Sequence, residues 1–366
     1  MRRDVAIGIL HSASGPYTAL AMVARAGILR GVAEVNADPS RDLAFTVHDR
    51  DPEGRLDRYA PLCRDLLPEK GLRHIFGCIT SSSRKEVIPE LERHDGVLWY
   101  SAPYEGFEAS AQVAYMHSCP NQHLLPLLDW AMPRFGRRVC LVGSNYIWGW
   151  EIAQIARERI LACGGQILSD RYLPIGDTAL DHIIAEMRAL RPDFIVNSLI
   201  GQSSYTFLAR LAELRSGPGA EIAAAKGSAP ALPVLSCNFT EGEIADAGPA
   251  AEGLIAAGPH FETGADGLGS IGEMSRLAVL ELADLLQGKP GAEDLPMAEL
   301  LAQAARQGHR SRLDGENQHA RQPVVVAELR DGRFHEILRL PERAADPYWT
   351  RREAPVPARP VLRVVP

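Results

Sequence analysis

The sequence has no long hydrophobic run and no excess of basic residues. Its N-terminal apolar stretch, residues 5–10, holds six residues, fewer than the roughly 7–15 of a signal-peptide core and the ~20 of a membrane span. Acidic residues outnumber basic ones by 46 to 39, a net charge of -7. Nonspecific nucleic-acid binding needs a basic surface. We therefore expect a cytoplasmic protein that contacts neither membrane nor nucleic acid directly.

Cysteine pairs and metal-binding spacings are also missing. The six cysteines are scattered, with no CxxC arrangement, and the histidines form no cluster along the chain. A metal site that can be recognised from sequence has closely spaced ligands, and a disulfide framework has regularly spaced cysteines. We expect free, buried thiols, no metal and no cofactor.

The familiar catalytic motifs are missing as well. There is no GxSxG, no HExxH, no P-loop, and no GxGxxG after the first strand. One arrangement leaves hydrolysis open, because Ser82 or Ser83 beside Lys85 resembles a serine–lysine pair. A nucleophile needs a positioned base and oxyanion donors, and a helical lysine is more often solvated. We expect a protein that is not an enzyme.

Apolar strands that alternate with helical segments dominate the chain. A length of 366 residues suggests two domains at about 150 residues each. The first series predicts strands at 6–10, 43–48, 73–78 and 96–100, with helices at 20–36, 58–67 and 84–93. The second predicts strands at 138–143, 166–172, 193–199 and 232–237, with helices at 124–135, 151–163, 180–190 and 203–214. Such alternation is typical of βαβ units. The fold class is α/β, with two doubly wound parallel sheets.

The C-terminal third follows a different pattern. Helices are predicted at 270–287 and 297–306, followed by strands at 324–330 and 334–340. Asp331-Gly332-Arg333 between these strands is a hairpin signal. Residues 216–230 are rich in Gly, Ala and Pro and predict a loop, and the proline-rich residues 344–366 predict an extended tail.

Small polar residues follow several predicted strands. Residues 77–85 (GCITSSSRK) lead into a helix, and residues 11–15 and 101–104 follow neighbouring strands. Open α/β sheets bind ligands beyond these strand ends, where helix N-termini offer free N–H groups. In the second series Tyr146 and Trp148 stand in the equivalent loop, and Gly201 and Asn238 follow later strands. The pattern predicts a ligand site between two lobes, with aromatic side chains on one of them.

Six segments together match a known family. They are Asp51-Pro52 with Asp57-Arg58-Tyr59, the 77–89 run with Ser81 and Pro89, Tyr100 with the PYEGFE run of residues 103–108, Pro120-Asn121-Gln122, residues 143–147 (GSNYI), and Asn317-Gln318-His319. Over residues 5–345 the chain resembles the type I periplasmic-binding-protein family. Within it, the resemblance is to the AmiC-type amide-sensing branch, which regulates aliphatic amidase expression.

The resemblance implies two lobes that are joined by three crossovers and close around a ligand. The N-terminal lobe would hold residues 1–118 and 249–320, and the C-terminal lobe residues 119–248 and 321–343. Ser81 would hold an amide group, and Tyr100 and Tyr146 would bind the ligand from opposite lobes. The remaining implied pocket residues are Ile79, Ala102, Pro103, Tyr104 and Trp148.

Three of these positions depart from the family pattern. Ile79 and Trp148 stand in place of tyrosines, and Ala102 in place of a threonine. The pocket thereby loses hydroxyl groups, which points to an amide more apolar than acetamide or to a related nitrogen compound.

The resemblance implies a cytoplasmic regulator that binds a small amide and controls an RNA-binding antitermination protein by sequestering it. Self-association into a homo-oligomer is compatible with this role. The alternative is a solute-binding receptor of an ABC transporter for an amide, urea or an amino acid. An amidohydrolase that uses Ser82 or Ser83 with Lys85 is the third hypothesis.

Overall fold

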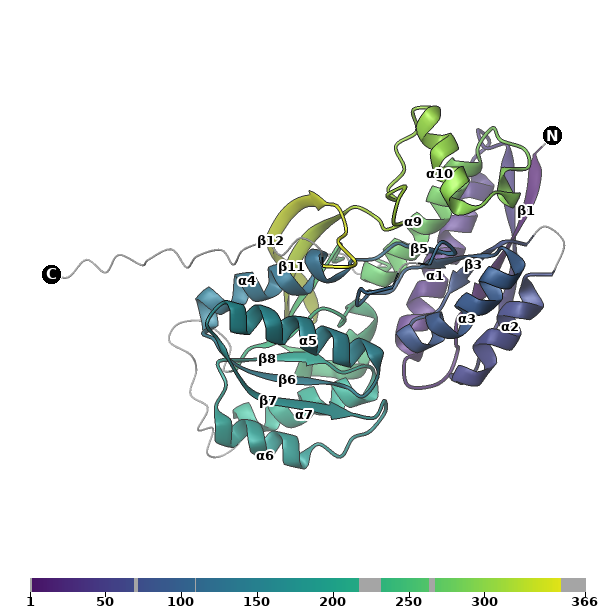
Figure 1. Cartoon of the computed structure of the whole chain (residues 1–366). Helices are drawn as coiled ribbons and strands as arrows, with labels where there is room; N and C mark the ends of the chain where they lie inside the picture. The colour runs from purple at the N-terminus through teal and green to yellow at the C-terminus, as the bar shows by residue number, and fades with distance from the viewer. Residues whose placement is uncertain (1, 69–71, 109, 217–231, 263–266, 350–366) are drawn as a thin grey trace.

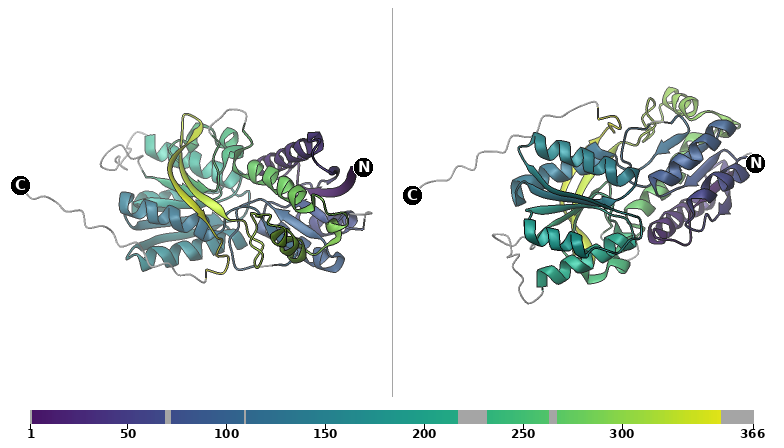
Figure 2. Two further views of the ribbon diagram at one scale, coloured as in Figure 1. Left: turned by 90° about the horizontal axis from the view of Figure 1, so that it is seen from above. Right: turned by 60° about the horizontal axis from the view of Figure 1, so that its bottom comes forward.

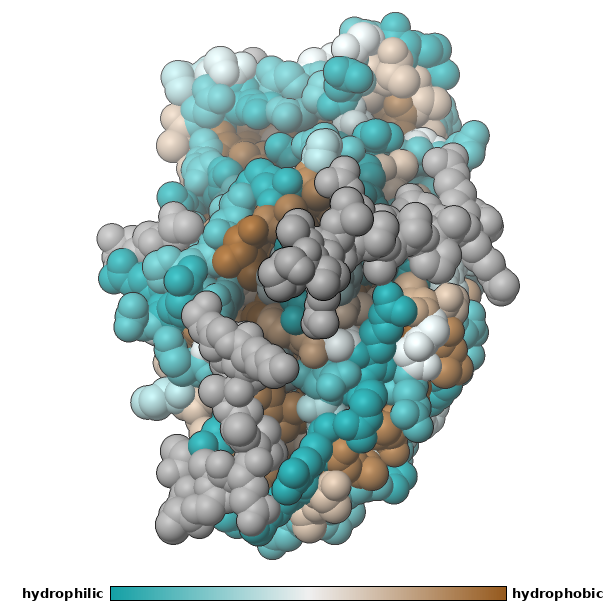
Figure 3. Space-filling model, turned by 90° about the vertical axis from the view of Figure 1, so that its left-hand side faces the viewer, coloured by the Kyte–Doolittle hydropathy of each residue, from teal (hydrophilic) through white to brown (hydrophobic). Residues whose placement is uncertain are grey.

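The computed structural model describes residues 2–68, 72–108, 110–216, 232–262 and 267–349, which form two α/β lobes side by side (Figure 1). Two further views show the same separation, with few segments running from one lobe to the other (Figure 2). Figure 3 views the molecule from the side of the second lobe, and hydrophilic side chains lie between the apolar ones on this face. Within the described residues, no helix has the length and hydrophobicity needed to cross a membrane.

Lobe 1 is built on a five-stranded, fully parallel sheet of order β2-β1-β3-β4-β5. Its strands are β1 (Arg3–Leu10), β2 (Leu43–Arg50), β3 (His74–Gly77), β4 (Val97–Tyr100) and β5 (Val113–Tyr115). Its helices are α1 (Thr18–Ala37), α2 (Tyr59–Leu66), α3 (Ser81–His94), α9 (Gly269–Leu286) and α10 (Met297–Arg306). Successive β1 side chains face opposite sides, so Ile7 and Ile9 pack with α1, α9 and α10 while Leu10 packs with α2 and α3.

Lobe 2 is built on a seven-stranded sheet of order β12-β11-β10-β9-β8-β6-β7. Its strands are β6 (Arg138–Ser144), β7 (Gln166–Leu173), β8 (Phe194–Ser198), β9 (Val234–Ser236), β10 (Ile255–Gly258), β11 (Gln322–Arg330) and β12 (Arg333–Arg343). Its helices are α4 (Leu124–Phe135), α5 (Ile147–Ala162), α6 (Asp181–Leu190), α7 (Gln202–Ser216) and the short α8 (Ile244–Ala247). The last two strands are antiparallel. Their predicted hairpin is confirmed, with φ of 52° at Asp331 and 70° at Gly332, as a type I′ turn requires.

The chain passes between the two lobes three times: after β5, after β10 and after α10. Two of these crossovers are hydrogen-bonded to each other. Tyr115 N donates to Gln318 O (2.9 Å), and Ala320 N donates to Tyr115 O (2.9 Å). Gln322 Nε2 donates to Met116 O (2.6 Å). The residue boundaries expected for the lobes are not tested by these contacts and stay a prediction.

Most of the predicted alternation is confirmed. The differences include β10, which is not predicted, and α5, which begins at Ile147 rather than at residue 151. The three-residue strand β5 was not predicted, since so short a segment carries no periodic signal. Helix α3 begins at Ser81 rather than at residue 84, which brings Ser81 into its first turn. All six cysteines are unpaired, and five are buried.

Parts of two predicted irregular segments lie outside the described residues, namely 217–230 of the loop and 350–366 of the tail. The start of the tail folds back on the protein. Asn121 Nδ2 donates to Ala344 O (2.9 Å), and Phe107 N donates to Pro347 O (2.7 Å).

Candidate ligand-binding site

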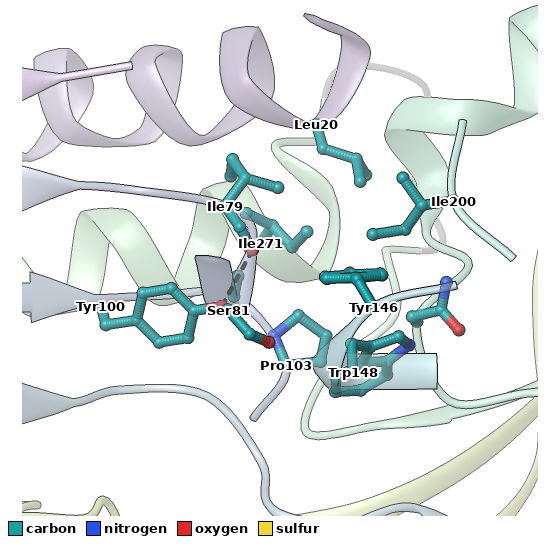
Figure 4. A pocket seen from close by; sticks show the side chains of 11 residues that line it. Leu20, Ile79, Ser81, Tyr100, Pro103, Tyr146, Trp148, Ile200 and Ile271 are labelled. Atoms are coloured by element: carbon teal, nitrogen blue, oxygen red, sulfur yellow. Dashed lines mark hydrogen bonds between the residues drawn. The ribbon is translucent and has the colours of Figure 1, made fainter. Parts of the chain in front are cut away.

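A pocket lies between the lobes, where the carboxyl ends of both sheets face each other (Figure 4). Its empty volume is about 320 Å³, which includes its opening to solvent. Eleven residues line it: Leu20, Ile79, Ser81, Tyr100, Ala102, Pro103, Tyr146, Trp148, Ile200, Asn238 and Ile271. Lobe 1 supplies the loops after β3 and β4 with α1 and α9, and lobe 2 supplies the loops after β6, β8 and β9. The site therefore forms only when the two lobes are close together.

Eight of the ten predicted site residues line this pocket. They are Ile79, Ser81, Tyr100, Ala102, Pro103, Tyr146, Trp148 and Asn238. That they bind a ligand stays a prediction. Sequence reasoning missed Leu20, Ile200 and Ile271, although Ile200 directly precedes the predicted Gly201.

Tyr104 is not one of the residues that line the pocket. Its ring is fully buried between Tyr115, at a centroid distance of 4.5 Å, and the Arg84 guanidinium, 4.8 Å from the ring centroid. Its hydroxyl bonds to the backbone of Glu108. The same guanidinium lies 4.7 Å from the ring centroid of Tyr100, so Arg84 links Tyr104 to a residue of the lining.

Gly201 also lies outside the lining, at a contact between the lobes. A Cβ built there would lie 1.9 Å from Pro16 O in lobe 1, and its φ is +57°. Only glycine tolerates both the backbone conformation and the close approach. Gly201 therefore permits lobe contact instead of lining the pocket.

Ser81 is positioned by a reciprocal cap at the start of α3. Thr80 Oγ1 accepts from Ser83 N (3.1 Å), while Ser83 Oγ accepts from Thr80 N (3.2 Å). These bonds hold the first turn in place. Ser81 Oγ donates its proton to Glu105 Oε2 at 2.8 Å. Because that proton is engaged, the Ser81 hydroxyl offers the pocket only its acceptor lone pairs.

The hydroxyl proton of Tyr100 is also engaged in a hydrogen bond within lobe 1. It donates to Ile79 O at 2.8 Å, as Figure 4 shows. Burial raises the pKa of Tyr100, although the nearby Arg84 charge opposes the rise. The phenol stays protonated and its proton is engaged with Ile79, so towards any further partner its oxygen can only accept. Lobe 1 therefore presents two hydrogen-bond acceptors to the pocket.

Lobe 2 contributes a different set of polar groups. Burial raises the pKa of Tyr146, so its hydroxyl stays protonated. Trp148 is buried, and its Nε1 has no hydrogen-bond partner among the described residues. Asn238 is held by its own contacts, because its Nδ2 donates to Leu199 O at 2.9 Å. An indole N–H only donates and a protonated phenol can donate, so lobe 2 brings donors to the pocket.

A buried ionic cluster is centred on Arg84 in lobe 1. Arg84 has no exposed surface, and its guanidinium bonds Glu105 Oε1 at 2.6 Å and Glu108 Oε1 at 2.8 Å. Glu108 also pairs with Lys85 and accepts from the Tyr115 hydroxyl at 3.0 Å. Burial opposes ionisation of Glu108, but the charges of Arg84 and Lys85 outweigh it and lower the pKa of its carboxyl. The opposite charges within the cluster balance one another. The ion pair with Arg84 also holds in place Glu105, which accepts the hydrogen bond from Ser81.

The serine–lysine arrangement is not assembled. Lys85 Nζ pairs with Glu108, and Ser83 Oγ donates to Thr80 O (2.9 Å) in the helix cap. Neither contact gives a serine a base. Within the described part of the chain, no group of three His, Cys, Asp or Glu side chains is placed to hold a metal ion.

The lining itself carries no charged side chain among the residues that the structure describes. Seven lining residues are apolar or aromatic without a hydroxyl: Leu20, Ile79, Ala102, Pro103, Trp148, Ile200 and Ile271. Burying an isolated ion in such surroundings is costly unless a counter-charge or several hydrogen bonds compensate it. The site therefore favours a small molecule with an apolar body and an uncharged polar group.

Comparisons with known proteins agree with this architecture. A family model described as "Periplasmic binding protein domain" matches residues 5–266. Among solved structures, an ABC-transporter solute-binding protein from R. palustris in complex with benzoate has a TM-score of 0.77 and 15% identity, over 94% of this chain and 99% of that one. The leucine-binding protein LivK from Thermotoga maritima has a TM-score of 0.72 and 15% identity, over 92% and 98%. LivJ from Streptococcus pneumoniae, in complex with isoleucine, has a TM-score of 0.73 and 15% identity, over 93% and 100%. At such low identity these structures establish the fold alone.

Proposed function

Because the chain belongs to the periplasmic binding protein domain family, we propose that it is a receptor whose lobes close around one small uncharged molecule. The observation that carries this proposal is the interlobe pocket without charged lining residues, in which Ser81 and Tyr100 present acceptor oxygens. A primary amide or a urea has N–H groups that match these acceptors, and an apolar substituent would fill the remaining surface.

We propose further that the receptor serves a transporter as its solute-binding component. Its structural neighbours include the benzoate-binding and isoleucine-binding transport proteins named above. The ligands of those two proteins are charged, whereas the pocket described here offers no charged lining group. We therefore expect the fold and the closing motion to be shared, and the class of ligand to differ.

Thermal-shift measurements on matched pairs test the class of ligand. The pairs are butyramide with butyrate and benzamide with benzoate, together with urea and L-leucine. We expect at least one uncharged compound to raise the Tm, and its carboxylate partner to leave it unchanged. Stabilisation by the carboxylates or by leucine alone would contradict the proposal.

The second candidate is the cytoplasmic amide-responsive regulator of an antitermination partner. It is favoured by one observation: the PYEGFE segment on which the resemblance depends contributes Pro103 to the pocket and Glu105 to the bond with Ser81. Fractionation of cells that produce the natural full-length protein separates the two roles. Export of the protein supports the transport role, and a cytosolic protein that releases an RNA-binding partner when ligand is added supports the regulator.

A further inference from the structure

Trp148, one of the lining residues, carries a hydrogen-bond donor that is unsatisfied among the described residues. The residue lines the cavity from lobe 2 and is only 3% exposed, and its Nε1 is buried without a hydrogen-bond partner among the described residues. Figure 4 shows its ring beside Tyr146 and Pro103. A buried donor without a partner destabilises the folded state, so a native protein that keeps one calls for an explanation.

Two neighbouring polar side chains already make hydrogen bonds of their own. The ring of His123, 6.0 Å from that of Trp148, accepts from Leu124 N through Nδ1 (2.6 Å) and faces Tyr104 O through Nε2 (3.2 Å). With Nδ1 accepting, the proton is on Nε2, and the ring has no lone pair left for an indole. Asn238 Oδ1 accepts from Ser236 Oγ at 3.2 Å. Among the described residues, no atom accepts from the Trp148 Nε1–H.

We infer that Trp148 is a specificity-determining residue whose Nε1–H donates to an acceptor atom on the bound molecule. This inference rests on the proposed function, because it needs a ligand in the interlobe pocket. It adds a requirement from the second lobe: the ligand offers donors to Ser81 and Tyr100 in lobe 1 and an acceptor to Trp148 in lobe 2. Such a ligand bridges the cleft, and its bond to Trp148 completes only when the lobes meet around it.

The test combines binding with direct observation of the indole proton. The full chain is labelled with ¹⁵N-tryptophan, which gives one indole signal for each of its five tryptophans, and the signal lost in Trp148→Phe identifies Trp148. Trp150→Phe is the matched control, since Trp150 lies on the same helix, is half exposed and already donates to Asn145 Oδ1 at 3.0 Å. The probes are butyramide, benzamide and benzoate.

We expect a saturating probe to shift the Trp148 indole proton downfield and to slow its exchange with solvent. We also expect Trp148→Phe to bind that probe about five- to tenfold more weakly, the effect of one lost hydrogen bond, and Trp150→Phe to bind it as the wild type does. An indole signal of Trp148 that does not move when the probe binds would overturn the inference. This holds even if Trp148→Phe binds the probe more weakly, because a loss of affinity without a change in the indole signal reflects lost packing.

The outcomes for the proposed function are separate. A wild-type protein that binds only benzoate contradicts the proposed ligand class, while the Trp148 signal still decides the inference. A wild-type protein that binds none of the probes contradicts the ligand class and this inference with it. Comparison of melting temperatures shows whether either variant is misfolded, and Trp148→Tyr, which restores an O–H donor, serves as a second variant in that case.

Discussion

The backbone of Gly201 in lobe 2 lies so close to Pro16 in lobe 1 that a Cβ on Gly201 would be 1.9 Å from the Pro16 carbonyl oxygen. Such a separation is far below any van der Waals contact, so a side chain there is incompatible with this arrangement of the lobes. The contact belongs to the same lobe arrangement that assembles the pocket, because Ile200, the preceding residue, is one of the lining residues.

Substitution Gly201→Ala should therefore hinder closure without changing a lining side chain. We expect ligand affinity to fall about tenfold or more, since the apparent Kd rises as the closed fraction falls. Gly248→Ala is the matched control, because Gly248 has nearly the same φ (+58°) and a Cβ there would have no described atom within 4 Å. Calorimetry and small-angle scattering measure affinity and lobe separation. Equal effects of the two substitutions would show that backbone strain, and not lobe contact, is responsible.

Removal of the Ser81 hydroxyl should weaken ligand binding selectively. Ser81→Ala deletes an acceptor that faces the pocket, and we expect about a five- to tenfold loss of affinity. Ser82→Ala changes the same side chain one position along the same helical turn, but Ser82 is not part of the lining, and its affinity should stay within twofold of the wild type. If both variants bind alike, the assignment of the Ser81 hydroxyl to the ligand is incorrect.

The buried Arg84 should matter for stability more than any exposed ion pair. Arg84→Met leaves Glu105 and Glu108 without their main counter-charge, and we expect a loss of about 3–5 kcal/mol in the free energy of unfolding. The exposed pair of Arg339 and Glu336 supplies the comparison, and Arg339→Met should cost less than about 1 kcal/mol. Urea unfolding measures both. Similar losses for the two variants would contradict a structural role for the cluster.

Glu243 should make stability depend on pH. Burial raises the pKa of its carboxyl to about 8, although bonds from Thr240 N (3.0 Å) and the Tyr205 hydroxyl (3.3 Å) oppose the rise. The unfolded chain releases this proton near pH 4.5, so the folded state binds more protons between these values. The stabilisation is complete below pH 4.5 and is lost as the pH rises to about 8.

Comparison with Glu243→Gln between pH 6.5 and 8 isolates this effect, because both proteins carry the same buried histidines, such as His11, His74 and His123, whose pKa burial lowers to about 3. Their unfolded pKa is 6.5, so their effect on stability fades as the pH rises above that value and is the same in both proteins. Over this interval we expect the wild type to lose about 2 kcal/mol relative to Glu243→Gln. If the free energy of unfolding changes with pH in parallel for the two proteins, Glu243 is not the cause of the pH dependence.

Sequence patterns predicted most of the lining positions near strand ends and missed those on α1 and α9. Ser81, Tyr146 and Asn238 follow apolar strands and Tyr100 ends one, and the edge of a parallel sheet gathers such positions. Leu20 and Ile271 reach the pocket from α1 and α9. Only the packing of those helices on lobe 1 brings them there, and no local pattern records it.

The role of the PYEGFE run was recognised only in part. Its specificity as a motif was evident, but burial of Arg84 against Glu105 and Glu108 depends on long-range pairing of the loop after β4 with α3. A charged residue on a helix predicts exposure unless its partners are known. The early start of α3 has a similar cause, since the Thr80 and Ser83 cap outweighs the later onset of apolar periodicity at Val87.

A crystal structure of the protein with the uncharged compound that raises its Tm most tests the central claim most directly. The account predicts that the compound lies between the lobes, with an N–H group at Ser81 Oγ and Tyr100 Oη, an acceptor at Trp148 Nε1, and Gly201 against Pro16. A compound bound outside this pocket, or one held there by a charged side chain, would contradict it.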